Sequence, residues 1–276
     1  MAGADNEAQI EFWNGQAGRT WADAQVQMDV MLAPLSAIAI DKANPQPGER
    51  AIDVGCGCGD TSVAMAQRGA AVWGVDISEP MLDRAKERAK GRKDLAFSKT
   101  DAATQAYTPD HPLLFSRFGV MFFADPIGAF KNLRTALTDD GRMVFICWQA
   151  PSANPWMSIA ARALQPFLTA PPSADPRAPG PFAFADRDYL IDVLTQAGFA
   201  NVRVEGATTN LHLGDNLDEV IRFQGEIGPI ARALAELQGE ERDKALRAVR
   251  DALSAHMTSD GLDLQAACWL VSATSR

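Results

Sequence analysis

Residues 53–60 read DVGCGCGD, a run with a glycine at alternate positions and an acidic residue at each end. The glycines are Gly55, Gly57 and Gly59, and the acids are Asp53 and Asp60. A glycine-rich turn after the first strand of a parallel sheet lets a ligand touch the backbone at the carboxyl edge of that sheet. The run therefore predicts a binding site for a small cofactor, and Cys56 lies within it.

The two acids narrow the choice of ligand. The dinucleotide fingerprint, G-x-G-x-x-G, needs a glycine at the position that Asp60 occupies. Carboxylates at Asp53 and Asp60 would also repel a pyrophosphate bound at the N-terminus of the following helix. They suit a ligand with cationic groups and no phosphate, such as S-adenosylmethionine, which carries a sulfonium and an α-ammonium group. A nicotinamide-dependent oxidoreductase stays open as an alternative, although it would need glycine at position 60.

The motif D-x-G-x-G-x-G after an apolar strand resembles the first motif of class I S-adenosylmethionine-dependent methyltransferases. The segment VWGVDIS (72–78) resembles the second strand of that family, and KTDAAT (99–104) resembles its third motif. The resemblance covers about residues 50–150 well and the remainder loosely. A three-glycine loop alone is a weak signal, but the loop and the acids at the following strand ends are jointly specific.

The resemblance assigns cofactor contacts residue by residue. Asp76 would bind both ribose hydroxyls, because a carboxylate accepts several hydrogen bonds at once. Ile77 and Met81 stand where the family packs the adenine ring. Asp101 and the backbone of Ala102 would meet the adenine amino group, although the segment DAAT also matches a plain helix N-cap.

Further residues are assigned to the cofactor site: Ser116, Arg117, Trp13 and Trp21. Ser116 and Arg117 end the expected fourth strand, and an arginine within an apolar stretch needs a partner. Trp13 and Trp21 lie in FWNGQAGRTW, whose polar and glycine spacing fits a flap over the cofactor and equally fits core packing.

Apolar residues near the expected ends of strands four and five are assigned to the methyl acceptor: Phe118, Met121, Trp148 and Trp156. Their density favours an apolar or aromatic small molecule. The stretch SRFGVMFFADP resembles bacterial methyltransferases related to the ubiquinone/menaquinone biosynthesis group. In-line methyl transfer needs chiefly alignment, and no histidine is assigned as a base. A non-catalytic S-adenosylmethionine-binding protein is the remaining alternative.

The overall composition limits the partners. The 276 residues carry a formal net charge of -9 at pH 7 and a pI near 4.9, which disfavours a nucleic-acid partner. We expect no signal peptide and no membrane span, because the N-terminal residues and the apolar runs match neither pattern. The cysteines, Cys56, Cys58, Cys147 and Cys268, are expected to be reduced thiols that bind no metal, in a cytoplasmic protein. A homodimer is compatible with the sequence.

Hydrophobic periodicity predicts a helical segment at 5–43, followed by strands that alternate with helices. The expected strands are 51–54, 71–76, 95–101, 113–121, 142–148, 201–213 (one long strand or a pair) and 264–275. The expected helices are 60–69, 78–91, 125–137, 186–199 and 216–257, and an irregular loop is expected at 169–184. This pattern predicts a mostly parallel sheet covered by helices on both faces. The resemblance to the methyltransferase family implies the rest of the expected fold, an α/β, Rossmann-like, doubly wound seven-stranded sheet with an antiparallel last strand and helical cap segments.

The same pattern divides the chain into core and cap segments. We expect a helical cap at 1–45, the S-adenosylmethionine-binding core at 46–150, a cap or lid at 151–184, more core at 185–214, a helical insertion at 215–262 and a last core strand at 263–276. The caps are expected to close over the acceptor, or else to add core or a dimer interface.

Overall fold

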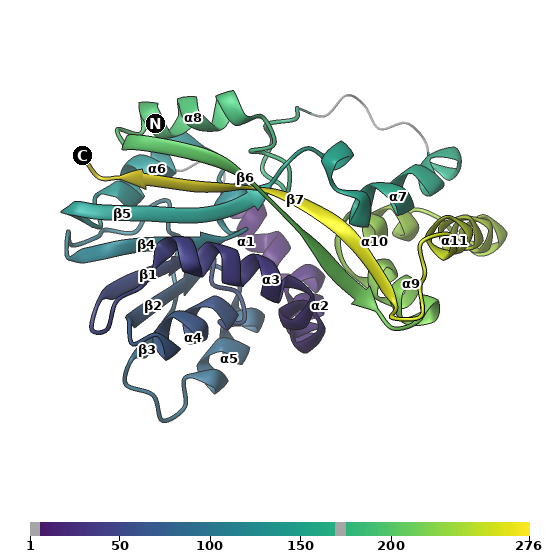
Figure 1. Cartoon of the computed structure of the whole chain (residues 1–276), viewed down its shortest axis with the longest axis horizontal. Helices are drawn as coiled ribbons and strands as arrows, with labels where there is room; N and C mark the ends of the chain where they lie inside the picture. Colours follow the sequence, from purple (N-terminus) through teal and green to yellow (C-terminus); the bar gives the residue numbers. More distant parts are fainter. Residues whose placement is uncertain (1–5, 169–174) are drawn as a thin grey trace. The chain divides into compact units, whose positions relative to one another are not determined.

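The structure of the protein is a computed structural model that describes residues 6–168 and 175–276. The chain forms two compact units (Figure 1). The first unit holds residues 1–149, 176–207 and 268–276, and the second holds 150–175 and 208–267.

A seven-stranded sheet forms the centre of the first unit (Figure 1). Its strands are β1 (Arg50–Val54), β2 (Ala71–Asp76), β3 (Leu95–Lys99), β4 (His111–Arg117), β5 (Leu137–Trp148), β6 (Ala200–Gly214) and β7 (Leu262–Thr274). The strand order is β3-β2-β1-β4-β5-β7-β6. β1 to β5 pair in parallel, and β7 pairs antiparallel with β5. The predicted fold class is therefore confirmed. β6 and β7 also supply residues to the second unit.

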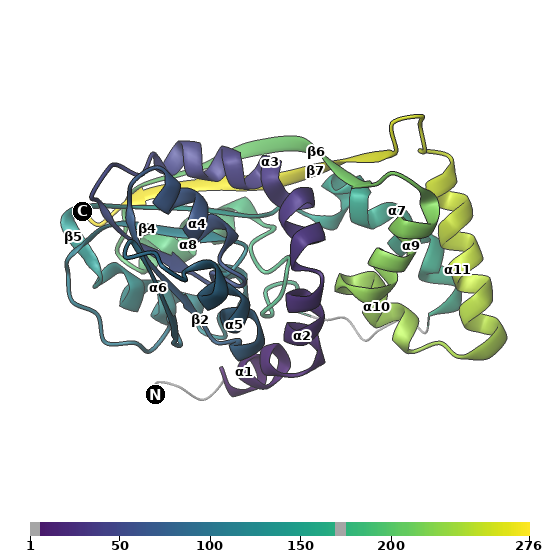
Figure 2. The same cartoon turned by 90° about the horizontal axis from the view of Figure 1, so that it is seen from below.

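Helices cover both faces of this sheet (Figure 2). The helices of the first unit are α1 (Glu7–Asn14), α2 (Gln16–Asp23), α3 (Gln25–Ala43), α4 (Asp60–Gln67), α5 (Glu79–Arg88), α6 (Pro126–Arg134) and α8 (Arg187–Gln196). On one face α3 packs on β4 and β5, α4 on β2, and α5 on β3. α6 and α8 pack together on the other face. α2 contacts both α3 and α5, so the N-terminal helices are anchored to the first of these faces.

The helices of the second unit pack on one another. They are α7 (Pro155–Leu164), α9 (Leu217–Glu226), α10 (Gly228–Ala235) and α11 (Gly239–Ser254). α11 contacts α7 and α9, and α10 contacts α7 and α9. Ala245, Val249 and Leu253 are the buried residues of α11. Their spacing of four residues places them on one face of the helix, as an amphipathic pattern requires.

The expected end of β4 and the expected start of β5 differ most from the structure. β4 ends at Arg117 and does not reach 121, because Phe118 takes a positive φ of 64° and residues Val120–Phe122 (η1) form a 3-10 turn. The strand expected at 142–148 begins five residues earlier, because β5 starts at Leu137, where it pairs with His111. The stretch 200–214 is a single long strand, which is one of the two expected alternatives. Of the expected loop at 169–184, residues 169–174 lie outside the described part.

Candidate functional site

The carboxyl ends of four parallel strands meet at one edge of the first unit. Val54 pairs with Val75, and Asp76 pairs with Lys99, so β1, β2 and β3 end side by side. Phe115 of β4 pairs with Asp53 of β1. The segments that follow these strands carry most of the predicted cofactor residues. The fold therefore brings together residues that lie far apart in the sequence.

The three glycines of the loop after β1 have different surroundings. All three have positive φ values, 66° at Gly55, 53° at Gly57 and 82° at Gly59. A Cβ on Gly55 would lie 2.5 Å from the Cα of Gly119, and one on Gly59 would lie 2.8 Å from the ring of Phe97. A Cβ on Gly57 would meet only the sulfur of Met81, at 3.7 Å. Gly57 is thus the loop glycine that borders open space.

Asp76 fastens this loop to the end of β2. Its Oδ2 accepts a hydrogen bond from the Gly57 backbone N–H at 2.8 Å, and its Oδ1 accepts one from the Ser78 N–H at 2.8 Å. The residue is 7% exposed. Burial raises the pKa of Asp76, although the backbone N–H groups of Ser78 and Gly57 oppose this shift. A carboxylate has about four lone-pair directions, so the side chain can still accept from a ligand.

Asp53 lies wholly within the protein. Its Oδ2 accepts hydrogen bonds from the hydroxyls of Thr61 at 2.7 Å and Ser62 at 2.6 Å, both in the first turn of α4. Its Oδ1 is buried and has no hydrogen-bond partner among the described residues. Burial raises the pKa of Asp53 to about 6. The carboxylate therefore anchors α4 and still has one unsatisfied oxygen.

Asp101 shapes the turn after β3. Its Oδ1 accepts from the Ala103 N–H at 2.9 Å and from the side-chain amide of Asn6 at 2.8 Å. No helix lies in the described segment between β3 and β4, so Asp101 caps a turn and not a helix, and its contact with Asn6 adds a link to the N-terminal segment. Ala102 is buried, and its carbonyl accepts from the Asn132 side chain at 3.1 Å.

Helix α1 is fastened to the segment that follows β2. The Asn14 side chain donates to the Ile77 carbonyl at 2.9 Å and accepts from the Glu79 N–H at 3.1 Å. The Ser78 hydroxyl donates to the Trp13 carbonyl at 2.7 Å. These polar contacts join residues 63 to 65 positions apart and could not be predicted from the sequence, in which Asn14 simply lies between Trp13 and Trp21.

Trp13 lies at the centre of an aromatic group. Its ring packs edge-on against Phe12 at 5.2 Å, Trp21 at 5.9 Å and Phe122 at 5.2 Å between ring centroids. Phe122 belongs to the 3-10 turn after β4, so the group joins α1 and α2 to that turn. Packing and a covering role are both compatible with this arrangement.

Hydrogen bonds and a stacked pair of rings fix the turn that follows β4. The Ser116 hydroxyl donates to the Val54 carbonyl at 2.7 Å and accepts from the Gly119 N–H at 3.2 Å. Phe118 has a left-handed backbone, which costs an L-residue roughly 1–2 kcal/mol. Its ring stacks on Trp148 with centroids 4.2 Å apart and planes 8° apart. Strain of this kind persists where the surroundings enforce it, often at functional sites. No sequence motif around Phe118 predicts this left-handed backbone.

The remaining predicted acceptor residues are Met121 and Trp156. Met121 is almost fully buried in the first unit, where its carbonyl accepts from the Gly180 N–H at 3.1 Å. Trp156 belongs to the second unit, where its indole N–H donates to the Asn154 side chain at 3.2 Å.

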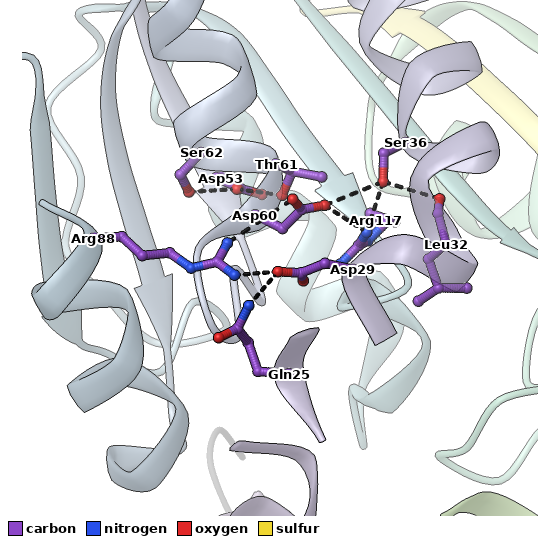
Figure 3. Close-up of polar contacts among 10 residues, drawn as sticks. All are labelled: Gln25, Asp29, Leu32, Ser36, Asp53, Asp60, Thr61, Ser62, Arg88 and Arg117. Atoms are coloured by element: carbon purple, nitrogen blue, oxygen red, sulfur yellow. Dashed lines mark hydrogen bonds and ion pairs between the residues drawn. The ribbon is translucent and has the colours of Figure 1, made fainter. Parts of the chain in front are cut away.

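Charged side chains of alternating sign lie beside the glycine loop (Figure 3). Arg117, at the end of β4, donates to Asp60 at 3.0 Å and to the Ser36 hydroxyl at 2.6 Å. Arg88 of α5 lies 3.9 Å from Asp60 and also pairs with Asp29 of α3. The partners that Arg117 needed are therefore Asp60 and Ser36.

The histidine of the first unit does not lie at this edge. His111 is the first residue of β4, at the opposite end of the strand, and burial lowers its pKa. His212 lies in the second unit, between Asp263 at 2.8 Å and Asp215 at 3.1 Å. His256 follows α11 in the same unit. Within 6–168 and 175–276, no group of three or more His, Cys, Asp or Glu side chains could hold a metal ion. No helix within those ranges has the length and apolarity of a membrane span.

Residues 51–141 match the family model described as a methyltransferase domain. The demethylmenaquinone methyltransferase of Clavibacter sepedonicus is 28% identical over 176 residues, which cover 60% of this chain and 72% of that protein. Uncharacterized mycobacterial proteins are 29% identical over 160 residues, and the match spans 58% of their length.

Solved structures share the fold. The YcgJ protein of Bacillus subtilis gives a TM-score of 0.57 at 18% identity, covering 87% of this chain and 97% of that one. Phosphoethanolamine N-methyltransferase 2 of Haemonchus contortus, in complex with S-adenosyl-L-methionine, gives 0.52 at 18% identity, covering 87% and 52%. Residues 51–141 are thus a methyltransferase domain, and the resemblance to class I S-adenosylmethionine-dependent methyltransferases is confirmed for this part of the chain.

Proposed function

We propose that this protein is an S-adenosylmethionine-dependent methyltransferase that transfers a methyl group to a small apolar or aromatic molecule. The observation that carries the proposal is the open space at Gly57, bordered by the Asp76 carboxylate at the carboxyl edge of the sheet. A dinucleotide fingerprint would need glycine at position 60, which Asp60 occupies.

The residues present fit the cofactor. A side chain at position 57 would fill the space that the ligand needs, and the buried Oδ1 of Asp53 lacks a donor among the described residues. Asp76 would accept from the ribose hydroxyls, and Asp101 with the Ala102 backbone would meet the adenine amino group. When bound, S-adenosylmethionine supplies the activated methyl group together with its leaving group.

The protein's own part is to align the two reactants and exclude water. Ile77 and Met81 would pack the adenine, and Trp13 with Trp21 would cover it. The links from α1 to the segment after β2 support this covering role, because they hold Trp13 beside Ile77 and Ser78. We propose that Ser116 and Arg117 contribute to the site by fixing the turn that follows β4.

The proposed chemical class of the methyl acceptor rests on the aromatic residues Phe118 and Trp148, which stack on each other at the turn after β4. The Phe118 ring is fixed by its stack on Trp148 and by a strained backbone, so it offers a rigid apolar surface beside the donor edge. Met121 completes the proposed acceptor set of the first unit, and Trp156 of the second unit stays a prediction from the sequence. We further propose that the segments 1–45, 151–184 and 215–262 serve as caps, and that the protein acts in the cytoplasm.

Two experiments test the proposal in sequence. Calorimetry with S-adenosylmethionine, S-adenosylhomocysteine and NADH should give binding for the first two ligands and none for NADH. Transfer of labelled methyl from S-adenosylmethionine into an organic-solvent extract of small molecules should then depend on the protein. Binding of NADH alone would replace the proposal with a nicotinamide-dependent enzyme. Tight cofactor binding with no transfer to any fraction would leave a non-catalytic binding protein.

A further inference from the structure

The side-chain amide of Asn14, the last residue of α1, bonds to the turn between β2 and α5 at two points. Its Nδ2 donates to the Ile77 carbonyl at 2.9 Å and to the Ile10 carbonyl at 2.7 Å, and its Oδ1 accepts from the Glu79 N–H at 3.1 Å. Both N–H groups of the amide are thus in use. The orientation of the amide is fixed, because a flipped amide would place its oxygen against two carbonyl oxygens.

This turn carries the residues proposed for the adenosine part of the cofactor. Ile77 is proposed to pack the adenine, and Asp76, the last residue of β2, is proposed to bind the ribose. The Oδ1 of Asp76 accepts from the Ser78 N–H at 2.8 Å, and its Oδ2 accepts from the Gly57 N–H at 2.8 Å. The two backbone groups bonded to Asn14 lie on either side of Ser78. A displaced turn would therefore also displace a hydrogen-bond donor of the Asp76 carboxylate.

The other end of α1 is attached to the next strand end. Asn6, which precedes α1, donates to the Asp101 Oδ1 at 2.8 Å. The Ser78 hydroxyl also donates to the Trp13 carbonyl at 2.7 Å. Helix α1 therefore joins the segments after β2 and after β3, which are the two segments assigned to the adenosine.

We propose that Asn14 is a positioning residue for adenosine recognition, which holds the turn 77–79 in the conformation in which Asp76 and Ile77 meet the cofactor. The proposal rests on the proposed function and adds a residue of α1 to the site. Asn14 would act through the backbone of Ile77 and Glu79 and would not itself contact the reacting atoms.

The alternative role of Asn14 is that of an external cap of α5, and Asn14→Asp separates the two roles. Glu79 is the first residue of α5, and Asn14→Asp keeps an acceptor for its N–H at the positive end of that helix. The same substitution removes both donors and sets a carboxylate oxygen against the Ile77 carbonyl. A cap alone predicts that Asn14→Asp behaves as wild type, whereas a positioning residue predicts that it behaves as Asn14→Ala.

Amide hydrogen exchange of the full chain without ligand is the first readout. The N–H groups of Ser78 and Gly57 report on the Asp76 carboxylate. The Glu79 N–H reports on the cap itself. Both Asn14→Ala and Asn14→Asp should speed exchange at Ser78 and Gly57 by about three- to tenfold, the equivalent of one lost hydrogen bond. At Glu79, Asn14→Asp should keep the wild-type rate, and Asn14→Ala should exchange faster.

Calorimetry supplies the second readout. S-adenosylhomocysteine and 5′-methylthioadenosine share the adenosine, and only the first of them carries the amino-acid part. Both Asn14 variants should bind both ligands about tenfold more weakly, because the lost contacts act on the shared part. Asn14→Asp keeps the test decisive if Asn14→Ala fails to fold.

Asn216→Ala is the matched control. The Asn216 side chain accepts from the Glu219 N–H at 3.0 Å and caps α9 in the second unit, so its loss removes a bond of the kind that Asn14 makes to Glu79. In this variant, exchange at Ser78 and the affinity for both ligands should stay at the wild-type values.

The outcomes separate this inference from the proposed function. Wild-type exchange at Ser78 and Gly57 in both Asn14 variants would overturn the inference, and so would wild-type affinity in Asn14→Asp. A loss of affinity for S-adenosylhomocysteine alone would overturn it too, because the effect would then lie at the amino-acid part. If exchange changes as expected but wild type binds neither ligand, the proposed function fails while the role of Asn14 in holding the turn stands.

Discussion

Replacement of Gly57 by alanine tests the proposed cofactor cradle most directly. The φ of Gly57 is 53°, so any L-residue there adopts a left-handed backbone, which costs roughly 1–2 kcal/mol. The added methyl would lie 3.7 Å from the Met81 sulfur, which is an ordinary contact and no clash. Gly57→Ala should therefore fold, with a free energy of unfolding lower by roughly 1–2 kcal/mol.

The same methyl group occupies the space where the cofactor should lie. We expect Gly57→Ala to bind S-adenosylhomocysteine at least about tenfold more weakly, which corresponds to about 1.4 kcal/mol. Gly57→Val should abolish binding, because its β-branched side chain is larger and tolerates the left-handed backbone less well.

Gly48→Ala is the matched control for backbone strain. Gly48 precedes β1, has a φ of 77° and has nothing within 4 Å of an added Cβ. Its alanine variant should lose a similar free energy of unfolding and keep full cofactor affinity. Gly55→Ala is the opposite case, because its Cβ would lie 2.5 Å from the Gly119 backbone. Overpacking and strain together should cost roughly 2–5 kcal/mol there.

Urea denaturation measures the stability of each variant, and calorimetry with S-adenosylhomocysteine measures affinity. A folded Gly57→Ala protein with wild-type affinity would refute the proposed cofactor cradle. Equal losses of affinity in Gly57→Ala and Gly48→Ala would also refute it, because they would trace the effect to stability alone.

Three further predictions follow from the same edge of the sheet. Asp76→Ala should weaken S-adenosylhomocysteine binding about 10- to 150-fold by calorimetry, the equivalent of ~1.5–3 kcal/mol for hydrogen bonds to a charged group; unchanged affinity would contradict its assignment to the ribose. Phe118→Gly should be more stable in urea than Phe118→Ala by about 1 kcal/mol, because glycine accepts a positive φ without strain; equal stability would contradict the left-handed backbone. Bound S-adenosylhomocysteine should slow amide hydrogen exchange across residues 7–23 more than across α6, because α1 is tied to Ile77, Ser78 and Asp101; uniform protection would leave α1 and α2 as ordinary packing elements.

The strand and helix pattern of the core could be predicted from the sequence because it is a local property. β1, β2, α4 and α5 begin and end within three residues of the expected boundaries. Apolar periodicity and glycine turns act over a few residues, and parallel strands separated by helices leave few alternative topologies. The edge at which Asp53, Asp76 and Asp101 meet follows from that topology.

Other features of the candidate site depend on contacts between residues far apart in the sequence, which the spacing of residue types along the chain does not predict. The N-terminal helix reaches the site through Asn6 and Asn14, whose partners lie 95 and 63 residues away. The end of β4 was placed four residues too late, because the left-handed turn at Phe118 is enforced by packing and has no local signal.

The glycine loop shows most clearly which features follow from the sequence and which depend on the tertiary structure. From the sequence alone the run DVGCGCGD identified the loop, its place after β1 and the need for a ligand without phosphate. Which glycine borders open space, how Asp53 is buried and which partners hold Arg117 were decided only in the folded chain. Ser36 lies 81 residues from Arg117, and their contact exists because α3 and β4 pack together. Backbone preferences are set by neighbours along the chain, whereas burial and charge pairing are set by neighbours in space.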